Sequence, residues 1–572
     1  MIKLTQKETD ILKNISHISG IFTLIVALTM LFSFIQLKTI NPLDNPAFVS
    51  LKEEYDKDPD NANKIEQVRA MDLVARKAYY STRRQIETGS YLLIAGAMLF
   101  ILCQRIIAGN EKTMPAVPGE KPDPGLRQRR GRKLLMISAS AITLGAILSS
   151  FLMRNNLPDL RTEKKPKTEE SGDNIGGKIN TDIAEDFNPD PTNYPFFRGQ
   201  DSRGIAGGDG YPTEWNAETG LNIKWKLQVP GYGKSSPVIW GDRIFLTTAI
   251  KGTTGEVYCI DKNSGSVLWT VSATGIPGEP SDLPEMDAEA GLAVPTAAVN
   301  STSVCAIFAN GNLLCLDHDG NKKWALNVGT LNNIYGYSSS LVIHDNTLII
   351  QHDSQGDLSI LGYDIETGEM KWKTARNGMP VWSSPIIATF DGQPQVIVNG
   401  NPAVTAFDPS DGKELWSVDC LTGDVAPSLA ANSNMVFAVT DYQKLAAIKP
   451  GTGASIVWED NMYTSDVSSP AANNRILVIA TGYGDVAFYN AQAGDTLWTH
   501  YFSDQFYSSP VIAGDMVYLT DRSGTTHIVN TVNSFSVISE CPLGEPVDGT
   551  PAFSDKMIFI RGRDNIYCIA RE

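Results

Sequence analysis

The clearest copy of a phrase that recurs along the chain reads Asp408-Pro-Ser-Asp-Gly-Lys-Glu-Leu-Trp416. It returns at Asp261–Trp269 and Asp364–Trp372, and one residue shorter at Asp317–Trp324. Asp and Gly favour the tight turn that joins two strands, and the Trp gives the second strand a large apolar anchor. The pattern therefore predicts a series of β-hairpins.

A second phrase, Ser-Ser-Pro followed by β-branched residues, marks the start of each repeat. It stands in full at 235–237, 383–385, 468–470 and 508–510, and in degenerate form at 295–296, 339–340, 427–428 and 549–551. Most of these eight starts are about 40–45 residues apart, which is the period of a β-propeller with four short strands in each blade. We therefore predict an all-β, eight-bladed propeller over residues 193–572.

The first third of the chain has a different composition. Three apolar runs, at about 15–37, 89–107 and 134–153, have the length that a helix needs to cross a bilayer. The basic cluster at 127–133 favours a cytoplasmic loop. Residues 1–153 are accordingly predicted to be a region of three transmembrane helices in the bacterial inner membrane, with the propeller in the periplasm. Residues 154–192 are polar and predicted to be a disordered linker.

Charge and motifs exclude several classes of function. The formal net charge of −16 argues against a nucleic-acid partner. The sequence contains no zinc-spaced cluster, Walker loop, nucleophile elbow or haem-attachment motif. The acidic insertion at 272–293 fits no EF-hand loop, so no metal site is assigned. Cys259, Cys315 and Cys568 occupy one repeat position that holds Gly or Ala elsewhere, which indicates a need for a small residue rather than a disulfide.

A specific resemblance begins where the repeats begin. The segments Tyr194-Pro-Phe-Phe-Arg-Gly199, Pro212-Thr-Glu-Trp215, Asn222-Ile-Lys-Trp225 and Pro230-Gly-Tyr-Gly-Lys-Ser-Ser-Pro237 resemble bacterial proteins with PQQ-binding-like propeller repeats. The same architecture is known from the assembly lipoprotein BamB and from quinoprotein alcohol dehydrogenases. The resemblance covers residues 194–572 and implies the fold more than the function.

The two ends of the repeat region predict how the ring closes. Trp225 occupies the repeat position of a Trp, but no strands of its own blade precede it, and the last unit lacks its outer strand. The strand around 223–227 is therefore expected to complete the eighth blade beside 566–569, which leaves no open edge.

Residues that precede the repeat starts are expected to surround one mouth of the central channel, and Arg198 is expected to approach the same axis. Aromatic and charged groups together suit a pocket. The candidate contacts are Arg198, Tyr232, Lys234, Tyr337, Trp382, Asp424, Asp466, Tyr507 and Asp548. The alternative is that these residues cap strand ends and turns, and both interpretations stay open here.

Two functions remain. In quinoprotein dehydrogenases PQQ lies between a Trp and a disulfide of adjacent cysteines, beside a calcium or lanthanide ion and an Asp base. This sequence has no adjacent cysteine pair, although Trp382 resembles a stacking floor. The leading interpretation is thus a membrane-anchored scaffold or protein-binding module in envelope protein assembly, with no catalytic residue and no cofactor. Its partners would be envelope proteins. The alternative is a PQQ- and calcium-dependent dehydrogenase.

Overall fold

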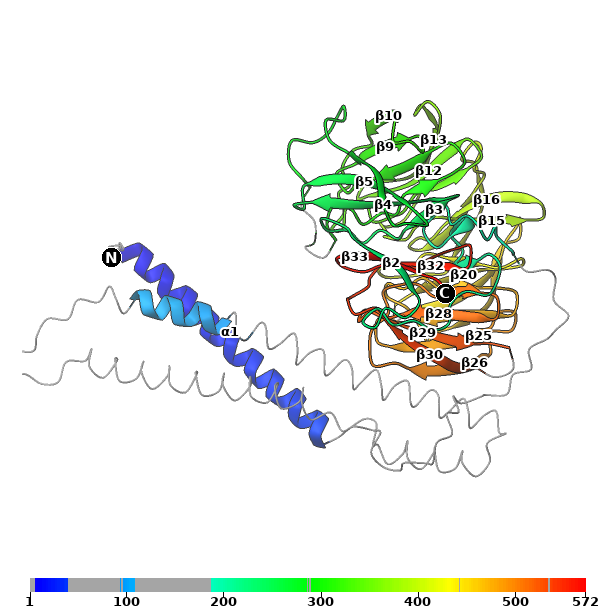
Figure 1. The fold of residues 1–572 in the computed structure, drawn as a ribbon. Coiled ribbons are helices and arrows are strands. Elements are labelled where there is room, and N and C mark those ends of the chain that lie inside the picture. Colours follow the sequence, from blue (N-terminus) through cyan, green and yellow to red (C-terminus); the bar gives the residue numbers. More distant parts are fainter. Residues whose placement is uncertain are drawn as a thin grey trace, which may run out of the picture. The chain divides into compact units, whose positions relative to one another are not determined.

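The computed structural model describes residues 6–39, 93, 96–107 and 187–571, apart from 285, 286, 288, 289, 442, 533 and 534. The chain divides into two compact units, Met1–Lys167 and Thr168–Glu572. The first contains helix α1 (Gln6–Thr39) and a shorter helical stretch at 96–107, and the second is built from strands (Figure 1).

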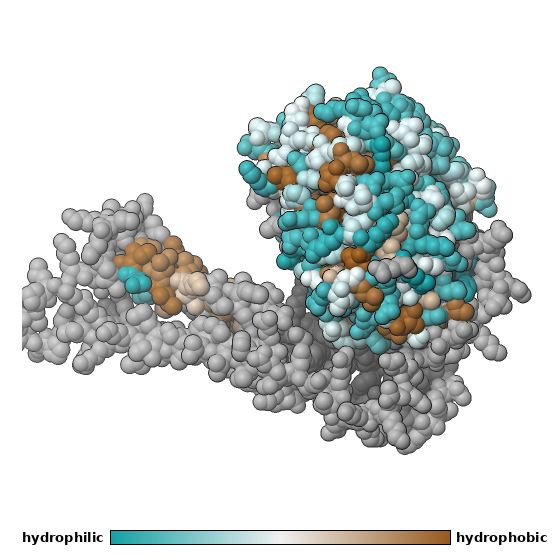
Figure 2. Space-filling view, viewed as in Figure 1, coloured by the Kyte–Doolittle hydropathy of each residue, from teal (hydrophilic) through white to brown (hydrophobic). Residues whose placement is uncertain are grey.

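Small and polar residues join the two helical stretches of the first unit. A Cβ atom on Gly20 would lie 3.1 Å from the Phe100 ring, and one on Gly96 would lie 2.6 Å from Thr23 Oγ1. Gln104 Nε2 donates a hydrogen bond to Ser16 Oγ over 2.9 Å. The larger apolar side chains lie on the outside, and they form the brown surface of this unit in Figure 2.

The prediction of three membrane-spanning helices is wrong. Within the described residues, no helix combines the length and the apolarity needed to cross a bilayer. In α1 the apolar residues are interleaved with Ser16, His17, Ser19 and Thr23, whose transfer into lipid is unfavourable.

Of the related predictions, the membrane location is wrong, and two segments lie outside the described residues. The multi-pass location in the inner membrane depended on those spans and is wrong with them. The third predicted span, 134–153, and the linker residues 154–186 lie outside the part of the chain that the structure describes.

The second unit is the predicted eight-bladed propeller (Figure 1). Blade 1 contains β3 (Val238–Trp240), β4 (Arg243–Ile250), β5 (Thr254–Asp261) and β6 (Val267–Ser272). Blade 2 contains β7 (Ala298–Val299), β8 (Val304–Ile307), β9 (Asn312–Leu316) and β10 (Lys322–Asn327). Blade 3 contains β11 (Val342–His344), β12 (Thr347–Ser354), β13 (Asp357–Asp364) and β14 (Met370–Ala375). Blade 4 contains β15 (Ile386–Phe390), β16 (Gln393–Val398), β17 (Ala403–Phe407) and β18 (Glu414–Asp419).

The remaining blades follow the same order, with two strands added from the N-terminal side. Blade 5 contains β19 (Ala430–Ala431), β20 (Val436–Thr440), β21 (Lys444–Lys449) and β22 (Ser455–Asp460). Blade 6 contains β23 (Ala471–Ala472), β24 (Ile476–Ala480), β25 (Asp485–Asn490) and β26 (Thr496–Tyr501). Blade 7 contains β27 (Val511–Ala513), β28 (Met516–Thr520), β29 (Thr525–Asn530) and β30 (Ser536–Pro542), with β1 (Ile205–Ala206) parallel to β27. Blade 8 contains β31 (Ala552–Ser554), β32 (Met557–Arg561), β33 (Asn565–Ile569) and β2 (Ile223–Gln228).

The closure predicted from Trp225 is confirmed. Strand β2 pairs antiparallel with β33, and Trp225 lies opposite Cys568. The interpretation of the cysteines is also confirmed, because all seven are free. In blades 1, 2 and 8 the repeated cysteine is the register partner of the repeat Trp, as in the Cys259–Trp269 pair, so a small residue leaves room for the indole ring.

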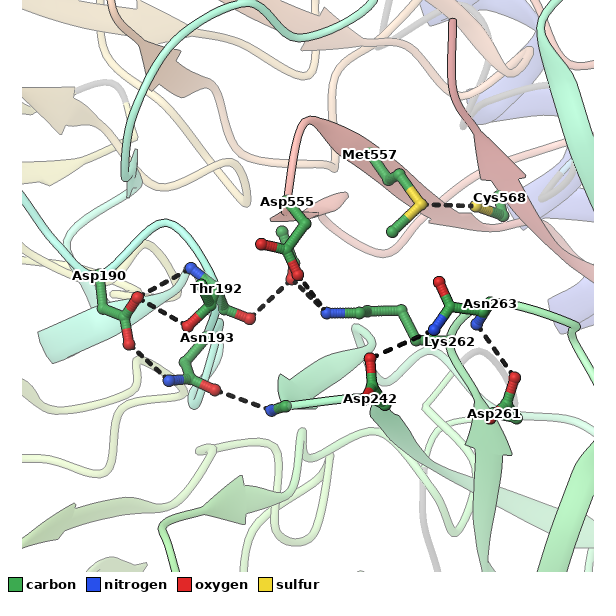
Figure 3. Close-up of polar contacts among 12 residues, drawn as sticks. Asp190, Thr192, Asn193, Asp242, Asp261, Lys262, Asn263, Asp555, Met557 and Cys568 are labelled. Atoms are coloured by element: carbon green, nitrogen blue, oxygen red, sulfur yellow. Dashed lines mark hydrogen bonds and ion pairs between the residues drawn. The ribbon is translucent and has the colours of Figure 1, made fainter. Parts of the chain in front are cut away.

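A polar clasp links the first and last blades (Figure 3). Lys262, on the turn after β5, lies with Nζ 2.5 Å from Asp555 Oδ2, on the turn between β31 and β32. Thr192 and Asn193 approach this pair from the N-terminal segment, and the Asn193 side chain accepts from the Gly241 N–H. The Lys262 side chain is 2% exposed, so the pair is shielded from water on one side.

Candidate functional site

A closed ring of hydrogen bonds surrounds the propeller axis. Each blade has a Ser or Thr hydroxyl just before its innermost strand, and that oxygen accepts a backbone N–H from the preceding blade over 2.8–3.1 Å. The eight residues are Ser236, Thr296, Ser340, Ser384, Ser428, Ser469, Ser509 and Thr550. We call this set the hydroxyl ring. Every member is at most 5% exposed.

The N-terminal segment 190–206 closes the channel on one side of the hydroxyl ring. Arg198 is fully buried and donates to the carbonyls of Leu429 and Pro470, each of which directly follows a member of the hydroxyl ring. Arg203 donates to the Ala431 carbonyl in blade 5. Phe197 lines the cavity on the other side, so the channel ends blindly at this segment.

The resulting axial cavity has a volume of about 420 Å³. Two positions of each repeat line it: the member of the hydroxyl ring and the residue two places before it. In an extended chain such alternate residues point to the same side. The second positions are Lys234, Val294, Ser338, Trp382, Ala426, Val467, Tyr507 and Asp548.

Six of the nine candidate residues from the sequence therefore line one cavity. They are Lys234, Trp382, Asp424, Asp466, Tyr507 and Asp548. The other three lie elsewhere. Arg198 is buried beneath the cavity, and burial lowers its pKa to about 10. Tyr232 lines a neighbouring cavity of about 180 Å³ together with Arg561.

Tyr337 does not line the cavity, because its side chain packs into the hydrophobic core around blade 3. Its side chain is fully buried, and its hydroxyl lies 2.7 Å from His352 Nδ1. Burial raises the pKa of the Tyr337 phenol above its usual range. Its role is to pack blade 3.

One wall of the axial cavity holds a compensated charge network. Lys234 Nζ lies 3.2 Å from Asp548 Oδ2, and Arg522 Nε lies 3.1 Å from Asp548 Oδ1. The Arg522 guanidinium also lies over the Tyr507 ring, 4.0 Å from its centroid. This wall therefore already pairs its carboxylate with cations of the chain.

A second wall is acidic and a third is aromatic. Asp424, Asp441 and Asp466 come from the connections of blades 5 and 6. Asp466 Oδ1 accepts the Gly482 N–H over 2.9 Å. Trp382 and Tyr335 meet edge to face with centroids 5.2 Å apart, and Trp382 Nε1 donates to Asn333 Oδ1.

Sequence reasoning missed the hydroxyl ring, Phe197, Tyr335 and Asp441. The signal for the ring was present, because the second position of every repeat start is Ser or Thr. The pattern by itself indicates only the beginning of a strand. Asp441 lies on a hairpin turn far from any repeat start, so no pattern in the sequence pointed to it.

The cavity residues do not fit PQQ. Trp382 offers one stacking face, but the seven cysteines are separate and free, so no disulfide plate covers a second face. In the part of the chain that the structure describes, no group of three His, Cys, Asp or Glu residues is arranged to hold a metal ion. The cavity contains four aspartates and one lysine, which disfavours a ligand with three carboxylates.

Comparison with known proteins agrees with this architecture. A family model described as outer membrane protein assembly factor BamB matches residues 197–379, 356–467 and 443–534. BamB of Burkholderia pseudomallei (strain K96243) is 23% identical over 372 residues, which cover 62% of this chain and 88% of the relative. BamB of Yersinia pestis is 23% identical over 283 residues, covering 47% of this chain and 66% of that protein.

Among solved structures, quinohemoprotein alcohol dehydrogenase from Comamonas testosteroni is similar with a TM-score of 0.51 and 13% identity. The likeness covers 66% of this chain and 80% of the dehydrogenase, and at this identity it shows the fold alone. The family match is different, because its overlapping segments run from 197 to 534 and take in more than half of the sequence. The chain therefore belongs to the family described as outer membrane protein assembly factor BamB.

Proposed function

We propose that this protein is a protein-binding module that takes part in the assembly of outer membrane proteins. The observation that carries the proposal is the family match over 197–534, because those residues build most of the cavity wall. The relatives are named for outer membrane protein assembly, which is a task of recognising other proteins.

The mouth of the axial cavity has the features of a protein contact surface. Val467 lines the cavity and is 37% exposed. Tyr335 on the aromatic wall is exposed, and Ile334 beside it and Met379, three residues before Trp382, are exposed as well. Apolar and aromatic side chains around a polar centre are typical of residues that anchor a partner.

Deletion of the gene in the organism that encodes the protein tests this proposal. We expect the amount of folded outer membrane β-barrel protein to fall, measured by heat-modifiable migration on gels, and to return when the full chain is supplied. A variant without residues 190–206 should not restore it, because the floor of the cavity is then missing. Unchanged β-barrel levels in the deletion strain would refute the proposal.

The dehydrogenase alternative predicts a different result. The full chain would be titrated with PQQ and calcium while cofactor fluorescence and alcohol-dependent dye reduction are recorded. We expect neither stoichiometric uptake nor turnover, because the acidic cavity offers only one stacking face. Turnover that disappears in Trp382→Ala would establish the enzyme function instead.

A further inference from the structure

We infer that the cavity of about 180 Å³ beside Tyr232 and Arg561, here called the side cavity, is a site for an oxyanion, a carboxylate or phosphate group. It lies among the connections of blades 7, 8 and 1. The inference goes beyond the proposed function, because a free anion can fill the site without a protein partner. Two independent observations carry it: a buried arginine with unused donors, and an excess of cations in the lining.

The first observation is that Arg561, the last residue of β32, uses only part of its guanidinium in the fold. Its side chain lines the side cavity, and the residue is 4% exposed. Nη1 donates to the Ser235 carbonyl at 3.2 Å, and to Ser235 Oγ and the Thr247 carbonyl at 2.6 Å each. Among the described residues, Nε and Nη2 have no hydrogen-bond partner. Buried donors without a partner are unfavourable, so these two nitrogens are available to a ligand.

Arg198 shows how the same fold satisfies a buried arginine without a ligand. Its two terminal nitrogens, Nη1 and Nη2, both donate to backbone carbonyls, those of Leu429 and Pro470. In Arg561 the second terminal nitrogen instead lies over Gly233, where a Cβ atom would come within 2.7 Å of Nη2. Gly233 lines the side cavity as well, and without a side chain it leaves this part of the guanidinium uncovered.

The second observation is the charge of the lining. Four cationic side chains surround the side cavity, against one carboxylate, Asp548; the four are Lys234, Arg522, Arg561 and Arg563. Asp548 is engaged by Lys234 at 3.2 Å and by Arg522 at 3.1 Å. Within the described part of the chain, Arg561 and Arg563 form no ion pair. The surplus of positive charge in a partly enclosed site attracts an anion.

Neighbouring groups do not neutralise Arg561. Glu545 is adjacent in sequence to the lining residue Pro546, but its carboxylate accepts the Asp564 N–H at 2.7 Å and Asn565 Nδ2 at 2.8 Å. Burial lowers the pKa of Arg561 to about 10, although the side chain of Tyr232 acts in the opposite direction, so the guanidinium stays charged at neutral pH. A planar guanidinium donates to two oxygens of a carboxylate or phosphate at once, which favours an oxyanion over a spherical anion such as chloride.

The test titrates the full chain with inorganic phosphate in a chloride buffer and follows binding by calorimetry. We expect saturable binding of one phosphate per chain, with an affinity that falls as the chloride concentration rises. Two peptides distinguish the source of the oxyanion: acetyl-Gly-Leu-Glu-Leu-Gly-amide and the same peptide with glutamine in place of glutamate. Competition with phosphate by the glutamate peptide alone assigns the group to a protein partner, and no competition by either peptide assigns it to a free anion.

Variants locate the binding. Arg561→Lys keeps the charge and a donor for the carbonyls of Ser235 and Thr247 but removes the planar guanidinium, so the affinity for phosphate should fall by about tenfold or more. Arg563→Gln changes an exposed residue of the lining and should lower the affinity by about threefold or more. Lys413→Gln, an equal loss of charge at an exposed turn outside the side cavity, should leave the affinity unchanged.

The inference is overturned if phosphate does not bind saturably, if neither Arg561→Lys nor Arg563→Gln weakens its binding, or if Lys413→Gln weakens it equally. Should Arg561→Lys fail to fold, Arg563→Gln decides the question. These results are independent of the proposed function. If phosphate binds as expected while β-barrel levels are unchanged on deletion, the oxyanion site stands and the assembly function does not. If β-barrel levels fall while phosphate fails to bind, the reverse holds.

Discussion

At the scale of the single residue, one hydroxyl connects each pair of neighbouring blades at the axis. Ser428 Oγ accepts the Ser384 N–H at 2.8 Å, and both residues are at least 95% buried. Without that oxygen the buried N–H would lose its hydrogen-bond partner in the protein.

Replacing Ser428 by alanine is therefore expected to lower the free energy of unfolding by about 1–3 kcal/mol. Ser428→Thr is the matched control, since threonine already serves at two positions of the hydroxyl ring, and its loss should be much smaller. Urea unfolding of both variants measures the difference. Equal stability of the alanine variant and the unmodified protein would show that the ring bond contributes nothing.

Asp201 in the short 3-10 helix η2 (Gln200–Ser202) makes the stability of the propeller depend on pH. Burial raises the pKa of its carboxyl to about 6, although Arg203 and His344 act in the opposite direction. The unfolded carboxyl titrates near 3.8, so the folded state binds more protons between these values. Stability contributed by this group accordingly falls as pH rises through that window.

Asp201→Asn removes the buried charge and keeps the shape, and asparagine tolerates the positive φ of 57° at this residue. The variant should be more stable than the unmodified protein by about 1–3 kcal/mol at about pH 7. Its advantage should shrink at about pH 4.5, where the carboxyl is mostly protonated in the folded state. A gain that is the same at both pH values would contradict a raised pKa.

The candidate site residues also show how much of the cavity could be predicted from the sequence. Trp382 and Asp548 were placed correctly at the cavity because each lies two places before a Ser or Thr of a repeat start. Tyr337 was misplaced, because its side chain packs into the core of blade 3. Asp466 stands equally far before its own ring residue and does line the cavity, so the position in the repeat does not decide where the side chain points. Arg198 was placed near the axis, but its position beneath the cavity depends on how segment 190–206 runs across the blades, which no repeat pattern encodes.

At the scale of the element, the repeated Asp-Gly-Trp phrase makes contacts in two blades. It fixes a turn within its own blade and packs against the preceding blade. The Asp261 carboxylate accepts the N–H groups of Asn263 and Ser264 and fixes the turn. The glycine of each such turn faces the Trp of the preceding blade: a Cβ on Gly265 would lie 2.7 Å from the Trp225 ring, and one on Gly368 would lie 2.6 Å from the Trp324 ring. The sequence predicted the hairpin, whereas this contact between blades required the three-dimensional arrangement.

A comparison of Gly368→Ala with Gly252→Ala separates the energetic effect of the contact between blades from that of the backbone strain in the turn. Both glycines have similar positive φ values, 75° and 72°, but nothing lies within 4 Å of a Cβ on Gly252. We expect a loss of about 1–2 kcal/mol from backbone strain in each variant. Gly368→Ala should lose a further 1–3 kcal/mol, approximately, through the collision with Trp324. Thermal unfolding at matched conditions gives both values, and equal losses would mean that the indole ring moves aside freely.

The helices of the first unit show why the sequence pattern gave a wrong prediction of membrane-spanning helices. Counting charges over a window identified 15–37 and 89–107 as bilayer spans, but the described residues of these two stretches meet through Gly20, Gly96 and the hydrogen bond from Gln104 to Ser16. A count of charges does not register uncharged polar residues such as Ser16, Ser19 and Thr23, which interrupt the apolar run of α1.

At the scale of the whole molecule, the ring is closed twice, by β2 in blade 8 and by the Lys262–Asp555 clasp between blades 1 and 8. The N-terminal segment then seals one side of the axis, so the cavity has a single open mouth. Binding of a protein partner through this mouth is the central claim about the molecule.

A photoreactive amino acid at position 467, at the mouth, tests that claim most directly when it is compared with one at position 267, on the outer strand β6. Both valines are similarly exposed, at 37% and 43%. Irradiation of cells is predicted to crosslink position 467, and not position 267, to an outer membrane protein or a component of its assembly machinery, identified by mass spectrometry. Crosslinks to such proteins from position 267 but none from position 467 would contradict the account.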